Sequence, residues 1–288
     1  MTKLSGKVAI VTGAGRHDGL GEAIALRFAE EGAHVVITDL GQPSQPFLSS
    51  DNIGTLNEMQ SVADAIRQQT SDRAQASEVA TMLCDVRSEE DVQRTIADTV
   101  TRFGKLDIVV NNAGVGYLMK PLVEYSVEEW DLVLDVNLRG PFLFTKHAAA
   151  HMIARQARGG PRGGRIINIA SRGAKHATPQ FVAYTSSKHG MVGLTRVSAM
   201  ELGPYGITVN AVCPNHVTTG LGAKQNAHRR KVLGKSLEEL MAFRKSQIPL
   251  GRVGRPRDTA NACLFLASDE AEYITGEAMN VSGGEEMH

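Results

Sequence analysis

The amino-acid sequence predicts a single α/β domain built on a doubly wound parallel sheet. Short runs rich in β-branched residues alternate with longer segments whose apolar residues recur every three or four positions. Strands that alternate with helices imply right-handed crossovers, so the strands run parallel and the helices cover both faces of the sheet. A chain of 288 residues is long enough for one large core of this kind, and we expect 1–288 to form one domain.

Five runs are expected to be buried strands, because they are short, continuous and rich in valine and isoleucine. They are Val8 to Val11, Val35 to Thr38, Ile108 to Val110, Ile166 to Ile169, and Ile207 to Val212. Helices between them begin at side-chain caps. Ser88 with Asp91, and Ser126 with Glu129, have the spacing of a capping box.

Three stretches interrupt this alternation and are expected at the surface. The first, 41–56, is rich in proline, serine and glycine and has no apolar period. The second runs from Ala157 to Gly164. The third runs from Val217 to about Lys245 and is basic in its first half.

Composition narrows the classes of function. The formal net charge is +0, with 42% hydrophobic and 22% charged residues, so no global field favours nucleic acid or an acidic membrane. The three cysteines are scattered and suggest neither disulfides nor a zinc cluster, and no signal peptide or membrane span is indicated, so we expect a cytoplasmic protein. His147 and His151 lie one helical turn apart but lack a third ligand, so we expect no metal.

A glycine-rich loop follows the first strand and runs into a helix. Glycines at such a turn let the backbone approach a pyrophosphate, whose charge is met by the N–H groups of the following helix. The strand and helix on either side make this a dinucleotide-binding signal and the fold Rossmann-like. The contacts expected from the loop are Gly13, Gly15, Arg16, Gly19, Leu20 and Gly21.

The second strand ends at Asp39, about 20 residues beyond the glycines, where an acid accepts hydrogen bonds from the adenosine ribose. Leu40, the next residue, is also expected to contact the cofactor there. A carboxylate would repel a 2′-phosphate by about 4 kcal/mol at about 4 Å in an intermediate dielectric. We therefore expect NAD rather than NADP, unless Arg16 or Arg73 compensates.

Further motifs appear in a fixed order along the chain. They are Asp85-Val86, Asn111-Asn112-Ala113-Gly114, Asn137 within Val136-Asn137-Leu138, Ser171 after a strand, and Tyr184 to Lys188 beginning thirteen residues later. With these motifs the sequence resembles the short-chain dehydrogenase/reductase family across nearly its whole length. The order and spacing make the resemblance specific.

The resemblance implies roles for these positions. The implied catalytic tetrad is Asn137, Ser171, Tyr184 and Lys188. The implied cofactor contacts beyond the loop are Asp85 and Val86 at the adenine, Asn112, Ala113 and Gly114 beside the sheet, and Tyr184, Lys188, Pro214, Val217 and Thr219 near the nicotinamide. It also implies that 217–247 forms a substrate lid and that the protein is a homotetramer.

Two features depart from the family pattern. Five residues separate Gly13 from Gly19, where the family usually has three, and His17 and Asp18 are the apparent extras. The family's Pro-Gly after the sixth strand is Pro214-Asn215 here. The first departure bears on the pyrophosphate geometry and the second on the nicotinamide contacts.

The implied residues fit hydride transfer between a carbinol and a ketone, which needs a reversible acid/base. Tyr184 and Lys188 are four apart and share a helix face, so the ammonium favours the phenolate. Ser171 would hydrogen-bond the substrate oxygen. Asn137 would have a structural role or hold a water that connects Lys188 to solvent.

We therefore expect an NAD-dependent alcohol dehydrogenase or carbonyl reductase acting on a small secondary alcohol or ketone. The basic stretch from Lys224 to Lys235 favours a second reading, a (3R)-hydroxyacyl-coenzyme A dehydrogenase, since the insertion at 41–56 and Pro214-Asn215 are similar to such domains of multifunctional β-oxidation enzymes. An NADP-linked ketoreductase and a dinucleotide-binding regulator without turnover are further alternatives.

Overall fold

The computed structural model describes residues 2–42, 53–72 and 77–288 of the chain. Its centre is a seven-stranded sheet in the order β3-β2-β1-β4-β5-β6-β7, and every neighbouring pair is parallel. The strands are β1 (Val8–Thr12), β2 (His34–Asp39), β3 (Val79–Leu83), β4 (Ile108–Asn111), β5 (Gly164–Ile169), β6 (Ile207–Pro214) and β7 (Ala278–Val281). The predicted doubly wound parallel sheet in a single domain is confirmed.

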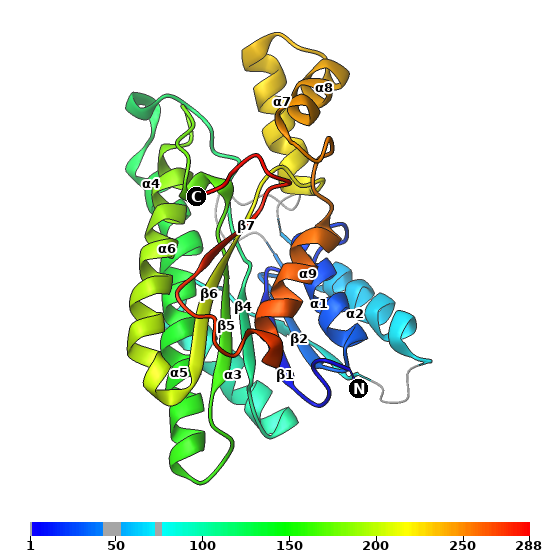
Figure 1. Cartoon of the computed structure of the whole chain (residues 1–288), viewed down its shortest axis with the longest axis vertical. Coiled ribbons are helices and arrows are strands. Elements are labelled where there is room, and N and C mark those ends of the chain that lie inside the picture. The colour runs from blue at the N-terminus through cyan, green and yellow to red at the C-terminus, as the bar shows by residue number, and fades with distance from the viewer. Residues whose placement is uncertain (1, 43–52, 73–76) are drawn as a thin grey trace.

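Helices cover both faces of the sheet (Figure 1). One layer consists of α1 (Leu20–Glu30), α2 (Leu56–Thr70) and α9 (Pro256–Ala267). The other consists of α3 (Glu89–Phe103), α4 (Val127–Leu134), α5 (Gly140–Ala157) and α6 (Val182–Leu202). Each helix places an apolar face on the sheet, as Phe28 of α1 and Phe144 of α5 show by being fully buried.

Two helices stand apart from these layers. They are α7 (Gly220–Leu233) and α8 (Leu237–Gln247), and they project beyond the end of the sheet in Figure 1. None of the residues of α7 is buried, whereas α8 buries Leu240 and Arg244. The surface stretch predicted from Val217 to about Lys245 is therefore a pair of helices joined to the domain at one end of the sheet.

The five predicted strands all form, and the structure adds β3 and β7. Both added strands lie at the edges of the sheet, and neither is fully buried. Edge strands carry a weaker apolar signal than central ones, because one side of the strand meets solvent.

The predicted surface stretches and caps need small corrections. The stretch predicted from Ala157 to Gly164 is shorter, because α5 ends at Ala157 and β5 begins at Gly164. Ser126 and Glu129 form the reciprocal capping box, but Ser88 forms only half of one. Its side chain accepts from Asp91, while the Asp91 carboxylate accepts from the backbone N–H of Asp85 instead.

Most of the predicted insertion at 41–56 lies outside the described residues. Its two ends are closed together, because Gly41 and Thr55 pair in an isolated parallel bridge and Gly41 N donates to Gly54 O at 3.0 Å. Thr55 then caps α2 by accepting from Glu58 N. Arg73 also lies outside the described residues.

Candidate active site

The glycine loop between β1 and α1 is packed too closely for side chains. A Cβ on Gly13 would lie 2.6 Å from Ala113 Cα, and Gly13 has a φ of 62°. A Cβ on Gly21 would lie 2.6 Å from both Ala14 Cα and Gly13 O. Glycine at these two positions lets α1 approach the sheet, and the N-terminus of α1 then faces the space above β1.

The two extra residues of the loop are held by neighbouring helices. The His17 ring nitrogens lie 2.8 Å from Glu22 Oε1 of α1 and 2.9 Å from Ser61 Oγ of α2. Asp18 has a φ of 58°, and its N–H donates to Glu22 at 2.7 Å. The longer loop is therefore tied down by its own contacts.

Asp39 lies at the end of β2, next to the glycine loop. Its carboxylate accepts from Gly15 N at 3.1 Å and from Leu40 N at 2.9 Å. Burial raises the pKa of Asp39, and these backbone donors and the charge of Arg16 offset part of that rise. An acid therefore stands where the sequence placed the ribose acceptor, and it also fixes the loop.

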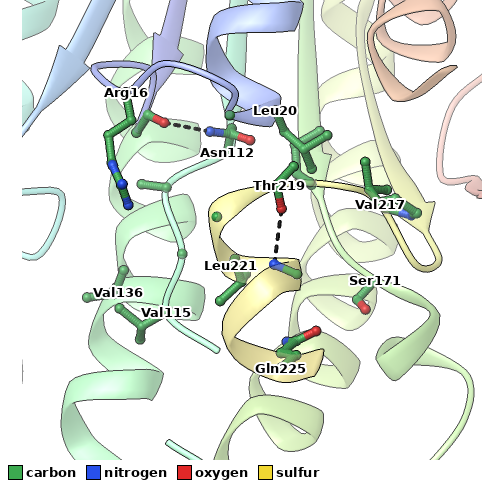
Figure 2. A pocket seen from close by; sticks show the side chains of 18 of the residues that line it. Arg16, Leu20, Asn112, Val115, Val136, Ser171, Val217, Thr219, Leu221 and Gln225 are labelled. Atoms are coloured by element: carbon green, nitrogen blue, oxygen red, sulfur yellow. Dashed lines mark hydrogen bonds between the residues drawn. The ribbon is translucent and has the colours of Figure 1, made fainter. Parts of the chain in front are cut away.

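The next two strands supply the other side of this region. Asp85 pairs with Arg87 at 2.6 Å, and although burial opposes it, this partner holds the pKa of Asp85 below its usual range. Asn112 donates through its side chain to Thr12 O at 2.8 Å and to Gly13 O at 3.0 Å (Figure 2). The amide thus joins the end of β4 to the glycine loop.

Ser171, Tyr184 and Lys188 come together from β5 and α6. Ser171 follows β5, and a hydrogen bond links its side chain to the Tyr184 hydroxyl. Lys188 Nζ donates to Ile169 O at 2.7 Å and lies 5.7 Å from the centre of the Tyr184 ring. Burial lowers the pKa of Lys188 to about 8.

The phenol differs from the sequence expectation. Lys188 was expected to bring the pKa of Tyr184 toward neutrality, but burial raises that pKa, and the hydrogen bond from Ser171 offsets only part of the rise. Burial is the main cause of this rise, and the Lys188 ammonium is directed to the carbonyl of Ile169. The lowering of the Tyr184 pKa that is expected when a nicotinamide is bound stays a prediction.

Asn137 is fully buried in a π-helical turn, Asp135–Arg139, between α4 and α5. Its Oδ1 accepts from Val115 N at 2.8 Å, and its Nδ2 donates to Val115 O at 2.8 Å and to Ser187 Oγ at 3.1 Å. Both amide hydrogens are taken. The side chain therefore joins the segment after β4 to α6 at Ser187, three residues after Tyr184.

One pocket collects nearly all of the predicted site residues. Figure 2 shows Arg16, Leu20 and Asn112 at one end of it, and Ser171 and Gln225 farther along. The predicted residues that line it are Gly13, Arg16, Gly19, Leu20, Asp39, Leu40, Asp85, Val86, Asn112, Ala113, Gly114, Ser171, Tyr184, Lys188, Pro214, Val217 and Thr219. Gly15, Gly21 and Asn137 lie behind its wall, where they support the residues that do line it.

The sequence did not identify several residues that line the pocket. Leu221 and Gln225 of α7 and Arg244 of α8 line the pocket, as does His216 after β6. Burial and the charges of nearby arginines lower the pKa of His216 to about 3. No motif identified the helical residues, because Arg244 is one of several basic residues in a stretch without apolar period.

Metal ligation and membrane insertion find no support in the part of the chain that the structure describes. No group of three or more His, Cys, Asp or Glu side chains there is arranged to hold a metal ion. His147 Nε2 lies 2.8 Å from Glu89 Oε1, across the gap between α5 and α3. Among the described helices, none has the length and apolarity needed to cross a bilayer.

Comparisons with known proteins show the family of this chain. Residues 55–286 match the family model described as enoyl-(acyl carrier protein) reductase. A short-chain dehydrogenase/reductase of Armillaria gallica is 38% identical over 279 residues, which are 97% of this chain and 95% of the relative. The fold and the pocket define an oxidoreductase. The chain belongs to the short-chain dehydrogenase/reductase family.

Two further relatives carry named activities. The NAD-dependent glycerol dehydrogenase of Listeria innocua serovar 6a is 35% identical over 281 residues, which are 98% of this chain and 94% of the relative. The crystal structure of carveol dehydrogenase from Mycobacterium avium in complex with NAD has a TM-score of 0.85 and 31% identity, and 99% of each chain is covered.

Proposed function

We propose that this protein transfers a hydride between NAD(H) and a secondary alcohol or ketone, with Tyr184 as the acid/base. The observation that carries the proposal is the presence of Ser171, Tyr184 and Lys188 in the same pocket as the glycine loop and Asp39. The reacting groups and the cofactor-binding groups thus share one cavity at the end of the sheet.

The residues present fit a dinucleotide. The closely packed glycines leave backbone N–H groups at the N-terminus of α1 for a pyrophosphate, and Asp39 offers a carboxylate to a ribose. When bound, NAD supplies the carbon that accepts or gives the hydride. Asp39 also disfavours a 2′-phosphate, which supports NAD over NADP, and two of the relatives named above are NAD-dependent or bind NAD.

The chain's own residues would handle the proton. The Ser171 hydroxyl donates to the substrate oxygen and stabilises its developing charge. Tyr184 takes the alcohol proton during oxidation and returns it during reduction. Lys188, held by Ile169 O, keeps a positive charge 5.7 Å from the ring and so favours the phenolate against the effect of burial.

We also propose that 217–247 is the substrate lid, because α7 and α8 supply Leu221, Gln225 and Arg244 to the pocket.

A homotetramer is supported by exposed apolar residues on α5 and α6, where Phe142, Val197 and Met200 are 47%, 57% and 81% exposed. A cytoplasmic location is supported by three cysteines that are buried and free.

A coenzyme A thioester is the second candidate substrate. It is favoured by the basic residues of α7, of which Arg230 and Lys231 are exposed near the end of the helix. Such residues suit the phosphates of an extended ligand lying over the lid.

The experiment is an activity panel of secondary alcohols, ketones and acyl thioesters with NAD(H) and NADP(H), followed at the nicotinamide absorbance. We expect NAD-linked turnover that Tyr184→Phe reduces by at least about a hundredfold, the scale of a lost general acid/base, while NAD binding persists. Binding of NAD without turnover of any panel member would overturn the proposal and favour a regulator.

A further inference from the structure

Arg244 is a buried arginine of α8, one of the two helices proposed as the lid. It is only 7% exposed, yet it lines the cavity. The ion pairs of 4.0 Å or less found among the described residues do not include it, and its Nη1 donates to the amide oxygen of Asn226. By contrast, the buried Arg155 lies 2.7 Å from the carboxylate of Asp107. A buried guanidinium without a carboxylate partner is costly to maintain for packing alone.

The surroundings of Arg244 are positively charged. Burial and the charge of Arg229 lower the pKa of Arg244 to about 10. The pKa of His216 is lowered to about 3 by burial and then by Arg244, Arg172 and Arg229, so His216 is neutral. Glu285 acts on Arg244 through its charge and offsets part of the lowering of the Arg244 pKa, but it makes no ion pair with Arg244, because Glu285 and Glu286 lie 3.5 and 3.7 Å from Arg172 instead.

Contacts of α7 link Arg244 to the surroundings of the proposed acid/base. Gln225, the neighbour of Asn226 on α7, donates to Gly116 O at 3.0 Å. A Cβ on Gly116 would lie 2.8 Å from the Tyr184 ring and 3.3 Å from the Gln225 amide. Gly116 therefore lies between the Tyr184 ring and Gln225 of α7, where there is no room for a side chain. Gln225 and Ser171 both line the pocket (Figure 2).

We propose that Arg244 binds a carboxylate carried by the substrate, so that the substrate is a hydroxycarboxylate or its oxo acid. This inference rests on the proposed function, since it names the substrate class of the same site. A planar guanidinium binds a carboxylate through two parallel hydrogen bonds and orients it. Holding the far end of the substrate in this way sets the carbinol carbon against Ser171 and Tyr184.

A carboxylate fits this position better than the phosphates of coenzyme A. Arg244 lies inside the pocket, whereas the bulky phosphates of a thioester would lie outside it, near the exposed Arg230 and Lys231. A compact anion attached to the substrate itself is therefore the partner that the buried charge selects.

The test compares acids with their methyl esters, which lack the negative charge and carry one additional methyl group. The probes are 3-hydroxybutyrate, 4-hydroxypentanoate and 5-hydroxyhexanoate, each with its ester, assayed with NAD. We expect the acid to exceed its ester in kcat/KM by at least about tenfold in one or more pairs. Arg244→Gln is expected to lower that acid-to-ester ratio by about tenfold to a hundredfold, the size of one charge-assisted hydrogen bond. Arg244→Lys restores part of it.

Lys245→Gln is the matched control, because Lys245 is the next residue of α8 and is exposed. It should leave the ratio unchanged, and melting temperatures confirm that each variant is folded. Equal turnover of acids and esters in all pairs, or an equal loss for both in Arg244→Gln, would overturn the inference.

A binding measurement separates this inference from the proposed function. Butyrate, pentanoate and hexanoate, which cannot be oxidised at a carbinol, are titrated calorimetrically into the protein with NADH. Carboxylate binding that Arg244→Gln abolishes, without turnover of any alcohol, supports the carboxylate site and refutes the dehydrogenase. Turnover of neutral alcohols without carboxylate binding or preference supports the dehydrogenase and refutes the carboxylate site.

Discussion

Lys188 Nζ lies 5.7 Å from the centre of the Tyr184 ring and donates its 2.7 Å hydrogen bond to Ile169 O. The ammonium is therefore fixed by the last residue of β5, the strand that Ser171 follows, and it acts on the phenol through space. Burial works against both groups, because it lowers the pKa of Lys188 and raises that of Tyr184. Each shift disfavours the charged form that the proposed chemistry uses, so the pocket has to stabilise those forms on binding.

The buried Lys188 predicts a pH dependence of stability. Its pKa is about 8 in the folded protein and near 10.5 when exposed. Between these values the unfolded chain binds more protons, so the free energy of unfolding rises with pH. Relative to Lys188→Met, we expect cofactor-free wild type to gain up to about 3 kcal/mol between pH 7 and pH 10.5.

Urea unfolding of both proteins across this range measures the gain. Lys245→Met serves as the control, because Lys245 is exposed and its removal should leave the pH dependence of wild type intact. Parallel stability curves for wild type and Lys188→Met would mean that the lysine is not desolvated.

Site residues that belong to a short local sequence pattern could be predicted from the sequence. The loop glycines, Asp39 and Ser171 lie at or just after strand ends, where a short motif marks both the element and the position. The structure brings Gly13, Gly19, Asp39 and Ser171 into one pocket. Tyr184 and Lys188 were identified through the resemblance to the family, and their spacing of four residues on a helix explains why they share a face.

Other features depend on distant packing and left no local signal. Arg244 became part of the pocket only because α8 folds back over the end of the sheet, which no spacing in the sequence specifies. The rise in the Tyr184 pKa follows from burial by several elements at once. Edge strands β3 and β7 were missed because half-exposed strands lack a continuous apolar run.

Asp39 is expected to set the choice of cofactor. Asp39→Asn keeps an acceptor for the ribose but removes the charge, so it should relieve most of the repulsion of a 2′-phosphate, about 4 kcal/mol at about 4 Å in an intermediate dielectric. We expect the ratio of kcat/KM for NAD over NADP to fall by at least about tenfold. Steady-state kinetics with both cofactors measures it, and a wild type that already prefers NADP would contradict the assignment.

Gly21 is expected to be intolerant of any side chain. In Gly21→Ala the new Cβ would lie 2.6 Å from Ala14 Cα, so α1 must move away from the loop at a cost of about 1–3 kcal/mol. NAD affinity should fall with stability. Gly203→Ala is the control, because a Cβ there meets nothing within 4 Å and its φ is −52°. Thermal unfolding and NAD titration of both variants test this, and equal behaviour would refute the packing argument.

Asn137 tests whether a buried amide positions the site or relays protons. Its side chain already holds both polar groups of the Val115 backbone and Ser187, so a side-chain relay to Lys188 has no free hydrogen to use. Asn137→Ala leaves buried groups unsatisfied and should cost about 2–4 kcal/mol, whereas Ser187→Ala removes a single hydrogen bond and should cost about 1 kcal/mol.

Because the loop after β4 loosens, kcat should fall in Asn137→Ala while the apparent pKa of its pH profile stays at the wild-type value. Chemical denaturation gives the stability change, and pH profiles of kcat for wild type and both variants give kcat and its apparent pKa. If Asn137→Ala instead shifted the apparent pKa without loss of stability, the residue would be moving protons, and its bonds to Val115 would be incidental to its role.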